Sequence, residues 1–155
     1  MSLLARRRGM MGDTSKFLFP LVAGFGTPGY FDVTVTSDGH IKRYNRNRQT
    51  ANKYFNLRDV ARYVQTVNCK TWFTLKKGET VTFMASSLPD MELNLYLANT
   101  STAYKMLTNT TKTLTFVVEE DVEIGCVAAR TRFAIDGGTT AEFDIALYVD
   151  GRRYF

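Results

Sequence analysis

The chain has 155 residues, enough for one domain with a buried core, and 45% of them are apolar, which excludes a mainly disordered protein. Its net charge of +5 is unevenly placed: residues 1–63 carry 11 lysines and arginines against 4 acidic residues, and residues 64–155 carry 9 against 11. The first part should therefore face an acidic partner. No apolar run reaches the ~20 residues that span a bilayer, so no membrane association is expected.

Residues 1–29 are predicted to form an extended N-terminal arm, because glycine recurs through them together with Pro20 and Pro28. A secretory signal is not expected, since Pro20 interrupts the apolar stretch and no small-residue cleavage site follows. Three adjacent arginines stand among apolar residues, a mixture that suits an anchor in a groove of another protein. The residues expected to bind that partner are Leu3, Leu4, Arg6, Arg7, Arg8, Met10 and Met11.

Residues 30–155 are predicted to be one β domain. It begins with a hairpin, in which "FDVTVT" alternates, Asp38-Gly39 turns and "IKRY" returns. The segment from Lys42 through Tyr54, which overlaps this returning strand, is basic and polar and is also predicted to be an exposed loop. Its mixture of arginine and tyrosine suits an acidic protein surface, a single-stranded nucleic acid, or plain solvation. The expected partner-binding residues are Lys42, Arg43, Tyr44, Arg46 and Arg48.

A short helix is predicted at about 57–65, where apolar residues recur with helical spacing after Asn56, a plausible N-cap. From Cys69 onward, short alternating segments are separated by turn residues such as Asp150-Gly151, and no further helical pattern appears. This pattern predicts an antiparallel β-sandwich of jelly-roll or Ig-like type, with one short helix and the extended arm.

No motif for catalysis, nucleotide binding or a metal site is present, so we expect a non-enzymatic protein without cofactor or metal. The single histidine, His40, is expected to be an exposed side chain in a turn. One acidic cluster is expected to be a solvated turn; it consists of Glu119, Glu120, Asp121 and Glu123. Calcium binding by loop aspartates is an alternative, and the candidates are Asp136, Asp144 and Asp150.

Cys69 and Cys126 lie in apolar segments and are expected to be buried free thiols, with a disulfide as the alternative. Four aromatic residues are expected to be core or interface rings, although exposed rings of this kind can also form a sugar-stacking platform. They are Trp72, Tyr96, Tyr104 and Tyr148.

The segments "FTLKKGETVTF", "LNLYLAN" and "FDIALYVDGRRYF" resemble jelly-roll or Ig-like domains of carbohydrate-binding modules and of accessory proteins of tailed-phage particles. The start, "MSLLARRRGMMG", resembles the arginine-bearing N-termini of virion proteins of crAss-like phages. The resemblance implies a capsid accessory, head-fibre or tail-decoration protein that is made in the host cytoplasm and resides in the virion. Arg6, Arg7 and Arg8 would fasten it to other virion proteins within a large or symmetric assembly. A lone carbohydrate-binding module, and a nucleic-acid-binding protein that uses residues 42–53, are the alternatives.

Overall fold

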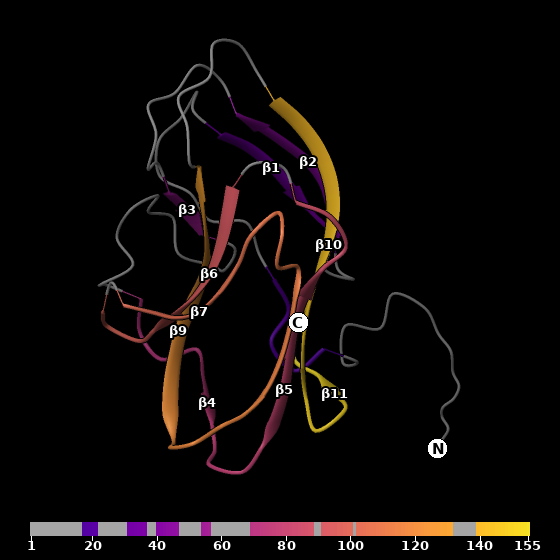
Figure 1. The fold of residues 1–155 in the computed structure, drawn as a ribbon. Coiled ribbons are helices and arrows are strands. Elements are labelled where there is room, and N and C mark those ends of the chain that lie inside the picture. Colours follow the sequence, from indigo (N-terminus) through magenta and orange to yellow (C-terminus); the bar gives the residue numbers. More distant parts are fainter. Residues whose placement is uncertain are drawn as a thin grey trace.

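The chain is mostly β, with two antiparallel sheets, in the part that the computed structural model describes (Figure 1). This confirms the expected fold class at that level. No helix in the described residues is long and apolar enough to cross a membrane. The helix predicted at 57–65 lies outside the described residues. The described ranges are 17–21, 31–36, 40–46, 54–56, 69–88, 91–100, 102–131 and 139–155.

The first sheet has the strand order β1-β2-β10-β5-β8, and β11 pairs with β10 off this path. The hairpin predicted from "FDVTVT" and "IKRY" is confirmed, because β1 and β2 pair antiparallel. The strands of this sheet are β1 (Phe31–Val35), β2 (His40–Arg46), β5 (Thr80–Ala85), β8 (Thr113–Val117), β10 (Thr139–Val149) and β11 (Arg152–Arg153).

The second sheet has the order β3-β9-β6-β7. The long strand β9 pairs with β4 near its start and with β3 near its end, and β6 runs along its other side. The strands are β3 (Tyr54–Asn56), β4 (Phe73–Leu75), β6 (Met91–Leu97), β7 (Ala103–Leu107) and β9 (Val122–Thr131).

Four of the strand pairs are nested along the chain. The innermost pair is β6 with β7, followed outward by β5 with β8, β3 with β9, and β2 with β10. The inner and outer pairs alternate between the two sheets. Along the sequence, the chain therefore forms β2, β3, β5 and β6 first and then forms their partners in the reverse order, from β7 to β10.

Apolar side chains from both sheets form one buried core. Strand β5 shows why, because Val81, Phe83 and Ala85 alternate with more exposed residues and all point inward. On β10, Phe143, Ile145 and Leu147 do the same. Each fully buried side chain of this size contributes about 1.5–3 kcal/mol to folding. The residues contributed by the second sheet are Phe73, Leu75, Leu93, Leu95, Leu107, Ile124 and Val127.

Part of the predicted arm packs against this core. Phe17 and Leu21 are buried, and the ring of Phe19 lies 5.0 Å from that of Phe73. Backbone hydrogen bonds join this segment to the end of the chain, from Leu18 N to the Arg153 oxygen and from Phe19 N to the Tyr154 oxygen. Residues 17–21 therefore pack with the domain that the sequence places at 30–155.

The predicted basic loop needs correction in two places. Lys42, Arg43, Tyr44 and Arg46 lie in strand β2, between β1 and β10, and not in a loop. Residues 54–56, at the end of that predicted loop, form β3 against β9. The prediction rested on polar composition, whereas antiparallel pairing with neighbouring strands satisfies the backbone whatever the side chains.

The outer face of β6 and β9 is also buried. Tyr96, Cys126 and Ala128 form a second cluster there with Cys69, which precedes β4. Both cysteines are buried thiols that form no disulfide, which confirms the expectation from their apolar surroundings.

Candidate binding site

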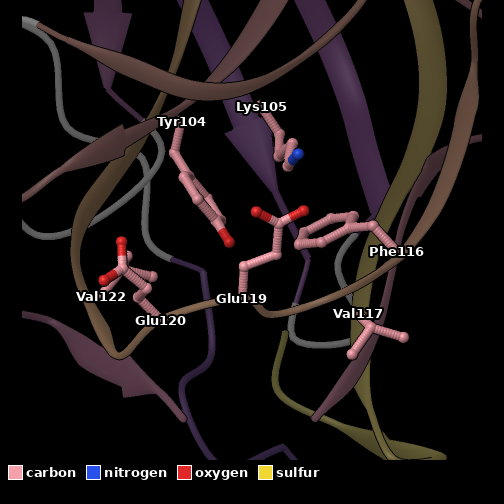
Figure 2. Close-up of a pocket in the computed structure, with 7 residues that line it drawn as sticks. All are labelled: Tyr104, Lys105, Phe116, Val117, Glu119, Glu120 and Val122. Carbon is pink, nitrogen blue, oxygen red and sulfur yellow. The ribbon is translucent and has the colours of Figure 1, made fainter. Parts of the chain in front are cut away.

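A surface hollow of about 440 Å³ lies where the start of β7 approaches the end of β8 (Figure 2). β7 supplies two residues to it, β8 supplies two, and the turn between β8 and β9 supplies the acidic ones. Both β7 and β8 are edge strands, each pairing with a single neighbour among the described strands. The lining residues are Tyr104, Lys105, Phe116, Val117, Glu119, Glu120 and Val122.

One wall of the hollow is aromatic. The rings of Tyr104 and Phe116 meet edge to face, with centroids 5.7 Å apart and planes at 75°. The Lys105 ammonium lies 4.4 Å from the Phe116 centroid and 5.2 Å from that of Tyr104. A cation is attracted to such ring faces, so this wall already holds one positive charge by cation–π contact.

The opposite part of the hollow is acidic. In Figure 2, the Glu119 carboxylate points into the space between Tyr104 and Phe116, and Glu120 lies beside Val122. Within the part of the chain that the structure describes, no hydrogen bond or ion pair engages either carboxylate. The neighbouring acids differ: Asp121 accepts a 2.8 Å hydrogen bond from Lys77 N and pairs with Lys76 at 3.7 Å. The hollow thus presents to solvent two carboxylates that have no ion-pair partner among the described residues.

The hydroxyl of Tyr104 responds to this environment. Burial raises its pKa above the ordinary value of 10.0, and the nearby Glu119 carboxylate raises it further. Tyr104 is therefore a neutral hydrogen-bond donor at physiological pH. Glu119 and Glu120 are exposed and lie next to Asp121 between β8 and β9, as predicted for a solvated turn, whereas Glu123 is the second residue of β9 and accepts a hydrogen bond from the Thr71 hydroxyl.

The four aromatic residues considered for a sugar-stacking platform have different surroundings. Trp72 stacks on Phe155 with centroids 5.2 Å apart and planes 9° apart. Tyr96 is buried, and Tyr148 is half-buried beside Arg153. Of the four aromatic residues, Tyr104 alone lines the hollow. The expectation that most of these rings belong to the core or to an interface fits Trp72 and Tyr96.

His40 occupies a different place from the predicted turn, because it is the first residue of β2 and is half-buried. It faces Asp144 across the β2–β10 pair, and its Nδ1 lies 2.5 Å from Asp144 Oδ1. Such cross-strand pairs stabilise antiparallel sheets.

Ser86 lies close to the same aspartate: its hydroxyl accepts a 2.9 Å hydrogen bond from Asp144 N, and its own amide donates to the Asp144 oxygen. No contact between the Ser86 hydroxyl and His40 is present in the described residues. The three therefore link strands, and the hydroxyl–imidazole contact that a hydrolytic triad needs is not part of the arrangement.

The aspartates considered for calcium have other contacts. Asp150 Oδ1 accepts a 2.9 Å hydrogen bond from Thr80 N, and Asp144 Oδ1 contacts His40 Nδ1. Asp136 lies outside the residues that the structure describes. In the described ranges, no group of three or more histidine, cysteine or acidic side chains is placed to hold a metal ion.

The other predicted binding residues are placed as follows. Leu3, Leu4, the three arginines, Met10 and Met11 lie outside the described residues, and so does Arg48. The hollow itself was not predicted, although its acidic turn was noted. The one available signal was the "TLTFV" segment, in which Leu114 and Phe116 alternate with threonines on a strand that proves to be an edge.

Comparisons of the chain with protein-family models, with curated proteins and with solved structures find no match.

Proposed function

We propose that this chain is a non-enzymatic structural component of a phage particle, in which copies of a jelly-roll domain associate into a symmetric assembly. The observation that carries the proposal is the nested strand pairing. Eight strands have the sheet orders β2-β10-β5-β8 and β3-β9-β6-β7, and this order supports a jelly roll, which is built from two Greek keys. Jelly rolls recur in viral capsid domains and in lectins.

Charge supports a particle component over a lectin. Residues 1–63 have a balance of +7 and the remainder a balance of −2, so different parts of the chain can attract each other between copies. The aromatic residues that a sugar platform would use are dispersed, with Trp72 on Phe155 and Tyr96 buried. The arm, with arginines beside leucines and methionines, fits an anchor between proteins.

The test is sedimentation velocity of the full chain over a range of concentrations, at low and at high ionic strength. The proposal predicts species much heavier than the 17.6 kDa monomer at low ionic strength, reduced at high ionic strength because salt screens charge pairs. A monomer at every concentration and both salts would overturn it. A glycan array and a gel shift with DNA would register the two alternatives, and we expect no specific signal in either.

A further inference from the structure

We propose that the hollow at the β7–β8 edge receives the arginines Arg6, Arg7 and Arg8 of a second copy of this chain. The inference rests on the proposed function, since it names the surface through which copies associate. The glutamates of the hollow would be the acidic partner that the sequence predicts for the basic arm.

The carboxylates of Glu119 and Glu120 carry the first step. Both are exposed and neither is used within the described part of the chain, whereas Asp121 has partners of its own. An arginine guanidinium can bind a carboxylate through two parallel hydrogen bonds. Lys105 makes its contacts with the two rings and forms no ion pair with the glutamates in the described residues. Two carboxylates are thus available to a group of arginines.

The apolar surroundings match the rest of the arm. Val117 is 57% exposed and Met106 is 41% exposed, and among the side chains whose exposure the structure describes only one other large apolar residue, Leu18 at 37%, is exposed. Val117 lines the hollow, and Met106 follows Lys105 on β7. The arm brings leucines and methionines on both sides of its arginines, and removing these side chains from water against exposed apolar surface favours association.

The strand edges favour an extended occupant. β7 pairs only with β6 and β8 only with β5 among the described strands, so the outer backbone groups of each can pair with an added segment. An arm without helical or strand periodicity can adopt such an extended form. A contact from the arm of one copy to the hollow of the next is head-to-tail, and such contacts form a closed ring when the rotation between copies closes and an open filament when it does not.

The experiment uses reciprocal charge reversal in the full chain, followed by sedimentation velocity at one protein concentration. The acid-reversed variant carries Glu119→Lys and Glu120→Lys, and the arm-reversed variant carries Arg6→Glu, Arg7→Glu and Arg8→Glu. Glu142→Lys is the matched control, because Glu142 is an exposed acid of β10 that does not line the hollow. Circular dichroism checks that every variant keeps its β structure.

Each reversed variant alone should associate about tenfold more weakly or worse, since it loses several charge-assisted hydrogen bonds. An equimolar mixture of the two should regain association, because the arm of each then meets a hollow of opposite charge on the other. The control should behave as wild type.

Wild-type association by the acid-reversed variant would overturn the inference while leaving the proposed function intact. Failure of the mixture to recover would also overturn it, since an arm that binds its own domain, or a different protein, cannot be rescued in this way. Absence of association in the wild type would overturn both proposals.

Discussion

The backbone amide of Phe19 donates a hydrogen bond of 2.7 Å to the carbonyl oxygen of Tyr154, and the rings of the two residues lie 5.1 Å apart. This contact joins two segments at opposite ends of the sequence. It divides the predicted arm in two, because residues 17–21 pack with the domain whatever the first 16 residues bind.

Two truncations test this division. A chain that begins at Ser15 should keep its free energy of unfolding within about 0.5 kcal/mol of the full chain. A chain that begins at Val22 loses buried Phe17 and Leu21, each worth about 1.5–3 kcal/mol, and should be at least ~3 kcal/mol less stable. Urea denaturation measures both. Equal stability of the two truncated chains would mean that residues 17–21 do not pack as described.

Phe155 should be among the most costly side chains to remove. Its ring is fully buried, stacks on Trp72 and meets Phe83 edge to face at 6.4 Å. Phe155→Ala should lower the free energy of unfolding by about 3–5 kcal/mol, through lost burial and the cavity left behind. Val117→Ala removes an exposed apolar side chain and should change it by less than about 0.5 kcal/mol. Similar losses for the two variants would contradict this core.

Gly125 is a position where a side chain does not fit. A Cβ atom there would lie 2.9 Å from both Ala98 Cα and the Cys69 oxygen. Gly125→Ala should therefore destabilise the fold by about 1–3 kcal/mol, because the backbone around Cys69 must shift. Gly78→Asn is the control: a Cβ atom at Gly78 would meet no atom within 4 Å, so only the strain of its φ of 92°, which asparagine tolerates better than most residues, should lower stability there. A Gly125→Ala variant as stable as wild type would show that Cys69 does not approach β9 so closely.

Local patterns predicted most of the strands, because alternation and turn residues act over a few positions. The segment "AYKML" became β7 with the same bounds, and the turn at Asp150-Gly151 is present with positive φ at both residues. Strand β3 was missed because its three residues follow a polar stretch, and only the pairing with β9 makes them a strand.

The hollow depends on contacts that sequence patterns do not encode. Tyr104 and Phe116 lie on different sheets, and they meet because β7 pairs with β6 while β8 pairs with β5, and the two sheets share one core. The acidic turn could be predicted from the sequence. The sequence did not show that Lys76 and Lys77 approach Asp121, and this approach determines which carboxylate of the turn has partners.

The free energy of unfolding should decrease at alkaline pH, in part because the folded chain raises the pKa values of Tyr104 and Tyr154. The pKa of Tyr104 is raised by burial and Glu119, and that of Tyr154 by burial and then Glu79, with Arg152 opposing. The unfolded chain therefore loses these protons first, near pH 10.0, and the free energy of unfolding decreases as pH rises from there through the folded-state values.

Urea denaturation of wild type and of Tyr104→Phe/Tyr154→Phe at several pH values separates this effect from other groups that titrate in the same range. The double variant should lose less stability between about pH 9 and pH 11, because the two groups no longer ionise in the unfolded state. An identical slope in both proteins would show that these tyrosines are not perturbed.

Electron microscopy of the full chain at low ionic strength can show whether copies of this domain assemble through their arms. We expect closed, symmetric particles, in which averaged images resolve repeated two-layer domains and density from a neighbour enters the hollow beside Tyr104 and Glu119. Particles should be lost in the arm-reversed variant and return when it is mixed with the acid-reversed one. Fields of single domains at every concentration, with no larger species, would contradict it.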